Sequence, residues 1–218
     1  MEKKKIKILW IGNSLTERNC LPEVFAKVAM SLGYEVEWVM VAPDGCTLIY
    51  HWHSRETISA IEANEWDIVV LQEQGGDPAM PYGYVADYVI PYASRLIGKI
   101  RQKSPNAQIV LFETWPGKNS FCLTRQWIRQ TYEVVARQNP GAVIASVGTA
   151  WHLIREEHCE IELYQKDGVH PTLAGTIEAA YVFCATIFGQ VAGAKLPWTD
   201  SAHDKILREI AHKVVLGR

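Results

Sequence analysis

The chain has 218 residues, of which 48% are hydrophobic and 21% charged, and its formal net charge at pH 7 is −2. This length suits one domain, and so small a net charge excludes a broad electrostatic surface for nucleic acid or an anionic membrane. No apolar stretch is long enough to cross a bilayer. The five cysteines are odd in number and form no CxxC pair, which argues against a disulfide framework or a Cys-rich metal site and favours a cytoplasmic protein.

Short apolar runs alternate with stretches of helical periodicity along the whole chain. Strands are predicted over residues 6–11, 35–41, 67–71, 108–112 and 143–147. Helices are predicted over 20–32, 54–63, 85–100 with a kink at Pro91, around 127–135, over 173–188 and around 206–214. Because strands and helices alternate, we expect a parallel sheet covered on both faces. No repeat or linker divides the sequence, so one α/β domain over residues 1–218 is predicted.

The loops that follow the predicted strands hold most of the small and polar residues. In a parallel sheet these loops gather at one edge. They contain Ser14, and the segment that leads to the helix at 173 contains Asp167 and His170. A serine, a histidine and an aspartate can form a hydrolytic triad, in which the hydroxyl attacks, the imidazole takes its proton and the carboxylate holds the imidazole tautomer. Asp167 and His170 are three residues apart, so a single turn can bring their side chains together.

Each of these signals also has an ordinary structural explanation. A Gly-Asn-Ser triplet such as 12–14 is commonly a turn, and an Asp-x-x-His segment is commonly a turn with a surface histidine. Gly45 can simply supply the positive φ of a turn. Gln72 and Gln74 can be the polar end of a strand.

Taken together, the segments resemble one family. Residues 12–16 (Gly-Asn-Ser-Leu-Thr) resemble the first sequence block of the SGNH hydrolases, the GDSL-like lipases and esterases, and residues 167–171 (Asp-Gly-Val-His-Pro) resemble their last block. The resemblance implies a three-layer α/β/α sandwich of about five parallel strands and an esterase that needs no cofactor. It implies Ser14 as nucleophile, His170 as general base and Asp167 as its orienting carboxylate. The amides of Ser14 and Gly45 would form the oxyanion hole.

The third block of that family departs from its usual pattern in this chain. Its usual Gly-x-Asn-Asp is replaced by Gln-Glu-Gln-Gly-Gly-Asp at residues 72–77. An ungapped match places Asp77 where the Asn would be, but an ionised carboxylate only accepts hydrogen bonds and would repel an oxyanion. A glutamine amide can donate, so Gln72 or Gln74 is predicted as the third oxyanion donor. Gln72 is favoured because it resembles a Leu-Gln variant of this block in a bacterial subgroup.

Two aromatic or histidine-rich features lie near the predicted site. His51-Trp52-His53 has the spacing of a metal-binding pair, but no carboxylate or cysteine lies at ligand spacing nearby. No metal site is therefore predicted there, and the histidines are expected to line a pocket or the surface. Trp115 is expected either to form a pocket wall or to pack in the core. The histidines at 152, 158, 203 and 212 are expected at the surface.

The leading hypothesis is a serine hydrolase that acts on small acyl esters, such as O-acetyl groups on carbohydrates. Aromatic loops and the absence of a large lid insertion favour short acyl groups over long-chain lipids. The alternative is a non-catalytic carbohydrate-binding protein on the same scaffold, which the missing third-block Asn keeps open. Nucleotide binding at residues 12–16 is least favoured, because neither Gly-x-Gly-x-x-Gly nor Gly-Lys-Ser/Thr is present.

Overall fold

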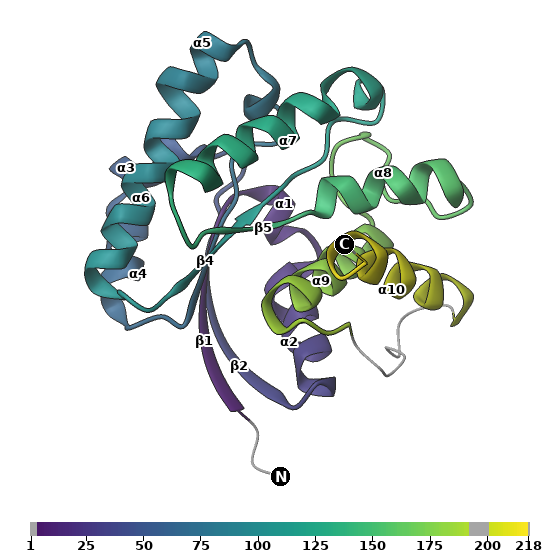
Figure 1. Cartoon of the computed structure of the whole chain (residues 1–218), viewed down its shortest axis with the longest axis horizontal. Coiled ribbons are helices and arrows are strands. Elements are labelled where there is room, and N and C mark those ends of the chain that lie inside the picture. Colours follow the sequence, from purple (N-terminus) through teal and green to yellow (C-terminus); the bar gives the residue numbers. More distant parts are fainter. Residues whose placement is uncertain (1–3, 192–200, 218) are drawn as a thin grey trace.

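A parallel sheet lies at the centre of the molecule, between two layers of helices (Figure 1). In this computed structural model, which describes residues 4–191 and 201–217, the sheet has five strands in the order β2-β1-β3-β4-β5. The strands are β1 (Lys4–Ile11), β2 (Tyr34–Val41), β3 (Ile68–Leu71), β4 (Gln108–Phe112) and β5 (Val143–Ala145). The predicted α/β sandwich with about five parallel strands is confirmed.

Helices cover the sheet on both sides. One layer contains α2 (Leu21–Ser31), α8 (Val147–Glu157), α9 (Leu173–Phe188) and α10 (Ser201–Val215). The other contains α3 (Leu48–His53), α4 (Arg55–Ala63), α6 (Ile90–Lys103) and α7 (Phe121–Gln138). Short turns of helix complete the chain: α1 (Ser14–Glu17), η1 (Arg18–Cys20), η2 (Asp77–Ala79), α5 (Tyr82–Tyr84) and the π-helical η3 (Val85–Val89).

Alternation along β1 divides the hydrophobic core into two clusters, one on each face of the sheet. Ile8 and Trp10 point into the layer of α2 and α9, whereas Leu9 and Ile11 point into the layer of α4 and α6. The indole of Trp10 contacts Phe183 edge-on, with ring centroids 4.9 Å apart. A strand that is buried on both faces reads as a continuous apolar run, which is why β1 was recognisable in the sequence.

The predicted elements differ from the structure near β5 and over residues 85–100, and the short helix α3 was not predicted. The fifth strand ends at Ala145, and Val147 instead begins α8, a helix that the sequence pattern did not predict. The predicted helix over 85–100 is divided into the π-helical η3 and α6, which begins at Ile90, one residue before Pro91. Proline has no N–H to donate, so regular α-helical hydrogen bonding cannot run unbroken through Pro91.

The register of the sheet positions the site. Ile11 at the end of β1 pairs with Val41 at the end of β2 and with Leu71 at the end of β3. Residues 12–16, 42–47 and 72–77 therefore leave the sheet side by side at its carboxyl edge. No helix within the described ranges combines the length and apolarity that a membrane span needs.

Candidate active site

Ser14 is the first residue of α1, and a short turn of two residues separates it from the end of β1 at Ile11. The Asn13 side chain caps this helix, since its Oδ1 accepts a hydrogen bond from Leu15 N at 3.1 Å. The Asn13 amide also donates to Cys46 O at 2.9 Å, which joins the turn to the loop after β2. Ser14 is 8% exposed. The Ser14 hydroxyl is thus held at the carboxyl edge of the sheet by a turn whose Asn13 side chain bonds both to α1 and to the loop after β2.

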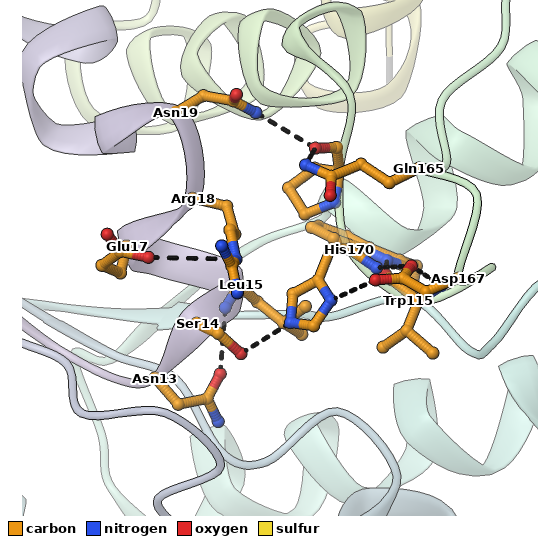
Figure 2. A network of polar contacts seen from close by, with 12 residues as sticks. Asn13, Ser14, Leu15, Glu17, Arg18, Asn19, Trp115, Gln165, Asp167 and His170 are labelled. Carbon is orange, nitrogen blue, oxygen red and sulfur yellow. Dashed lines mark hydrogen bonds and ion pairs between the residues drawn. The ribbon is translucent and has the colours of Figure 1, made fainter.

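His170 and Asp167 lie against this serine, although Ser14 and His170 are 156 residues apart in the chain (Figure 2). His170 Nε2 is 2.9 Å from Ser14 Oγ, and His170 Nδ1 is 2.7 Å from Asp167 Oδ2. An ionised carboxylate can only accept, so Nδ1 carries the proton and Nε2 is left to accept from the hydroxyl. The structure therefore brings together the three side chains that the sequence analysis proposed.

Backbone hydrogen bonds hold the Asp167 carboxylate in its charged form. Its Oδ1 accepts from Val169 N at 2.8 Å and from His170 N at 3.0 Å. These amides, together with the bond from the His170 ring, lower the pKa of Asp167 from 3.8 to about 2. Hydrogen bonds to a charged form favour that form, so the carboxylate stays ionised over the whole range in which an imidazole can act as a base.

The loop that carries His170 is anchored at both ends. Tyr164 and Pro171 form an isolated antiparallel bridge, and Gln165 N donates to His170 O at 2.8 Å. Pro171 O also accepts from Asn19 Nδ2 at 3.0 Å. Thr172 then caps α9 by accepting from Gly175 N. These contacts fix the imidazole relative to the turn that carries Ser14.

A pocket of about 500 Å³ opens beside Ser14 and His170. Its walls include Leu15, Gly45, Gln74 and Trp115. Gly45 has φ +67°, the left-handed conformation that glycine adopts without strain. Within the described ranges, the amides of Ser14 and Gly45 donate to no protein acceptor. Both are therefore available to a ligand in the pocket.

Gln74 is one of the residues that line the pocket. Its Oε1 accepts from Gly76 N at 2.7 Å and from Asp77 N at 3.2 Å, so the side chain is fixed in one orientation. Its Nε2 donates to no group among the residues that the structure describes. An oriented amide with a free N–H in the pocket is suited to bind an oxyanion.

The preference for Gln72 as an oxyanion donor is wrong. Gln72 is fully buried, and its Nε2 donates to Asn13 Oδ1 at 2.9 Å and to Glu73 O at 2.6 Å. Its Oε1 accepts from Asn13 N at 2.9 Å and from Thr16 Oγ1 at 2.8 Å. Every polar atom of this amide is engaged beneath the nucleophile turn, so no N–H remains for the pocket.

His51 also belongs to the support of the turn, and the expectation that it lines a pocket or the surface is wrong. It is fully buried, with Nε2 2.7 Å from Gly12 O and Nδ1 2.8 Å from Thr57 Oγ1. A carbonyl only accepts, so Nε2 carries the proton. Burial lowers the pKa of His51, which keeps the ring neutral in this role. The short helix α3 that carries it gave no periodic signal in the sequence.

Glu73 lies between the two glutamines and was not predicted to matter. Its carboxyl accepts from Gln74 N at 2.7 Å and from Leu48 N, at the start of α3, at 3.1 Å. It is 1% exposed, and burial raises its pKa from 4.5 to about 8. The only sequence signal was an acidic residue directly after a buried strand, which is where such a group can reach neighbouring amides.

Trp115 was expected either to form a pocket wall or to pack in the core, and it does both. It lines the pocket, is 3% exposed, and stacks on Trp151 with ring centroids 3.7 Å apart. Its Nε1 donates to Val169 O at 3.0 Å, next to His170.

Of the four histidines expected at the surface, those at 152, 158 and 203 are half-buried and His212 is exposed, so the expectation of surface positions was too simple. No group of three metal-ligating side chains gathers anywhere in residues 4–191 and 201–217.

Comparison with known proteins supports the fold. The sequence matches no protein-family model and no curated protein. The structure is similar to a DUF4886 family protein from Bacteroides uniformis, with a TM-score of 0.80, 16% identity and coverage of 98% of this chain and 95% of the other. It is also similar to a candidate SGNH hydrolase from Slackia heliotrinireducens, with a TM-score of 0.68, 29% identity and coverage of 84% and 100%. A catalytic mutant of an acetylxylan esterase from Geobacillus stearothermophilus gives a TM-score of 0.61 at 16% identity, with coverage of 92% and 100%.

These neighbours share the arrangement built up above from the strands and their covering helices. In its five-stranded parallel sheet between two helical layers, the chain has the fold of the SGNH hydrolases, as the sequence analysis predicted.

Proposed function

We propose that this protein is a serine hydrolase that cleaves small acyl esters, with Ser14, His170 and Asp167 as its catalytic triad. The observation that carries the proposal is the continuous chain of hydrogen bonds from Ser14 Oγ through the His170 ring to Asp167, with distances of 2.9 and 2.7 Å. A hydroxyl, a base and an orienting carboxylate in this order are what nucleophilic acyl transfer requires.

In the first half-reaction, Ser14 Oγ attacks the ester carbonyl carbon and its proton passes to His170 Nε2. The carbonyl oxygen becomes an oxyanion, which accepts hydrogen bonds from the amides of Ser14 and Gly45 and from Gln74 Nε2. His170 then gives its proton to the alcohol oxygen, the ester C–O bond breaks, and the alcohol leaves. The acyl group remains bound to Ser14 Oγ as an ester.

In the second half-reaction, water replaces the alcohol. His170 Nε2 takes a proton from the water, whose oxygen attacks the acyl carbon and forms a second oxyanion at the same place. Return of the proton to Ser14 Oγ expels the serine and releases the carboxylic acid. Asp167 stays ionised throughout and stabilises the imidazolium that forms twice in each turnover.

The pocket supports a short acyl group. Leu15, Trp115 and Gly75 form its apolar part, and a Cβ on Gly75 would lie 3.1 Å from Leu15 Cδ1. Glycine at position 75 therefore lets this segment lie close to Leu15, and only a small group fits in the space beside the Leu15 side chain. We infer that acetyl and similarly small acyl groups are the preferred substrates, and that an acylated carbohydrate is the natural class.

Labelling by a fluorophosphonate tests the proposal directly. We expect the reagent to modify Ser14, and Ser14→Ala to abolish both labelling and hydrolysis of 4-nitrophenyl acetate, with a loss of about 10³-fold or more. Ser31→Ala is a matched control, because Ser31 lies at the end of α2 and its Oγ donates only to Val28 O. Ester hydrolysis that persists in Ser14→Ala would refute the nucleophile. Sugar binding without any labelling of Ser14 would instead support the non-catalytic carbohydrate-binding alternative.

A further inference from the structure

A second cavity, which the proposed mechanism does not use, lies between the 78–85 segment and α7. Its volume is about 740 Å³, which is in the range of sites for small organic ligands. One wall consists of residues from η2, α5 and η3, and the other of α7 side chains that begin with Trp127 and end with Arg137. We call it the α7 groove.

The α7 groove and the catalytic pocket share one segment of chain as a common wall. Gly76 lines the catalytic pocket and Pro78 lines the α7 groove. Two residues of chain span at most about 7 Å, so the two cavities are neighbours at the same edge of the fold. A substrate that reacts at Ser14 can therefore extend over this wall into the groove.

The shared wall is held in place by side chains. Thr131 Oγ1 donates to Pro78 O at 2.7 Å, and Tyr84 OH donates to Asp77 Oδ2 at 2.9 Å. Gln74 Oε1 accepts from the amides of Gly76 and Asp77. The wall is thus tied to α7 and to Gln74, which lines the pocket beside Ser14. Its rigidity keeps a fixed distance between the groove and the reacting serine.

The lining of the groove is mostly apolar and includes two exposed aromatic rings, with a few polar side chains along α7. Tyr82 is 77% exposed and Trp127 is 48% exposed, although both are large and apolar. Gln130 and Arg137 lie on the α7 side of the groove. Aromatic faces next to hydrogen-bonding groups suit a ligand that has both apolar C–H faces and hydroxyls.

We propose that the α7 groove is a subsite for the alcohol part of the substrate, and that it binds the sugar units next to the acylated one. This inference rests on the proposed function for its reaction, but it makes a separate claim about binding. The groove sets the preference of the site for oligosaccharide esters over esters of simple alcohols, with the ring faces of Trp127 and Tyr82 as its main contacts.

Competition between two substrates tests the role in specificity. The measurement is the ratio of kcat/KM for acetylated xylotetraose to that for 4-nitrophenyl acetate. We expect Trp127→Ala and Tyr82→Ala each to lower this ratio about 10-fold, which is the usual effect of removing an aromatic side chain from a binding site. Met30→Ala is the control, because Met30 is 53% exposed on α2 and should leave the ratio unchanged. A ratio unchanged in both aromatic variants would overturn the proposal, as would a selective loss of activity on long-chain acyl esters.

Binding without turnover separates this inference from the proposed function. Calorimetry on Ser14→Ala with xylotetraose and cellotetraose should detect binding of at least one, and the additional change Trp127→Ala should weaken it about 10-fold. If neither sugar binds although the wild-type protein hydrolyses 4-nitrophenyl acetate, the subsite is wrong and the esterase stands. If a sugar binds in a Trp127-dependent way but no ester is cleaved, the groove stands and the catalytic proposal fails.

Discussion

Gln72 and Gln74 are two residues apart, yet their surroundings differ, and we expect them to have different roles. Gln72 is buried and saturated with hydrogen bonds, whereas Gln74 lines the pocket and its Nε2 has no hydrogen-bond partner among the described residues. We predict that substitution of Gln72 acts mainly on stability and that substitution of Gln74 acts mainly on rate. The informative variants are Gln72→Met, which has a similar volume but no amide, and Gln74→Glu, which keeps Oε1 as acceptor and removes the N–H donor.

The expected magnitudes follow from the contacts. In Gln72→Met the amide of Asn13 and the hydroxyl of Thr16 lose their acceptor in a buried place. Each buried donor without a partner costs about 1–3 kcal/mol, so the free energy of unfolding should fall by about 2–6 kcal/mol. That is a large part of the roughly 5–15 kcal/mol that stabilises a typical domain. In Gln74→Glu one oxyanion donor is removed, which lowers kcat by about 10²-fold or more.

Two measurements on the same samples decide the matter. Urea unfolding followed by tryptophan fluorescence gives the stability, and hydrolysis of 4-nitrophenyl acetate gives kcat for the folded protein. The assignment requires the Gln72 variant to lose more unfolding free energy and the Gln74 variant to lose more kcat. A Gln74→Glu enzyme with nearly full kcat would refute the oxyanion role, and a Gln72→Met protein as stable as the wild type would refute the buried clamp.

Three further predictions concern the same edge of the sheet. A Cβ at Gly12 would lie 2.5 Å from Gln72 Oε1 and 2.6 Å from Thr16 Oγ1. Gly12→Ala should therefore lower the free energy of unfolding by about 1–3 kcal/mol, measured by urea unfolding. An unchanged urea midpoint would show that the turn can adjust to the methyl group. Burial raises the pKa of Glu73 from 4.5 to about 8, so the folded state holds a proton that the unfolded state releases, and the free energy of unfolding should fall as pH rises between about 5 and 8. Glu73→Gln should reduce this fall. A pH profile of stability identical to that of the wild type would contradict the raised pKa. The pKa of Asp167 is lowered from 3.8 to about 2, so its contribution to stability is present above about pH 4 and is lost as pH falls towards 2. The difference in urea midpoint between wild type and Asp167→Asn should therefore shrink at about pH 2.5, and a constant difference would count against it.

The sequence was sufficient to predict the sheet and the meeting of distant residues. Buried parallel strands are continuous apolar runs, and the rule that their carboxyl ends share one edge predicts that loops 12–16 and 72–77 are neighbours. The juxtaposition of Ser14 with Asp167 and His170 needed the family resemblance as well, since their loop follows a helix rather than a strand.

The errors have physical causes. The helices α3 and α8 were missed because six residues are too few to show helical periodicity, and because β5, only three residues long, runs almost directly into α8. Gln72 and Gln74 could not be told apart because they have the same parity after β3, and the strand alternation stops at Leu71. Only the contacts of Asn13 and Thr16 reveal which glutamine lies under the turn.

The wide separation of Ser14 and His170 has a consequence for how the protein comes into being. Ser14 is synthesised before His170, which lies 156 residues further along the chain, and the loop that carries His170 is secured by α9 and by Asn19. Contacts between such distant residues form late and slowly in folding. Under the proposed mechanism, a partly folded chain therefore carries an unreactive serine, and labelling of Ser14 by a covalent probe reports when these two distant segments have come together.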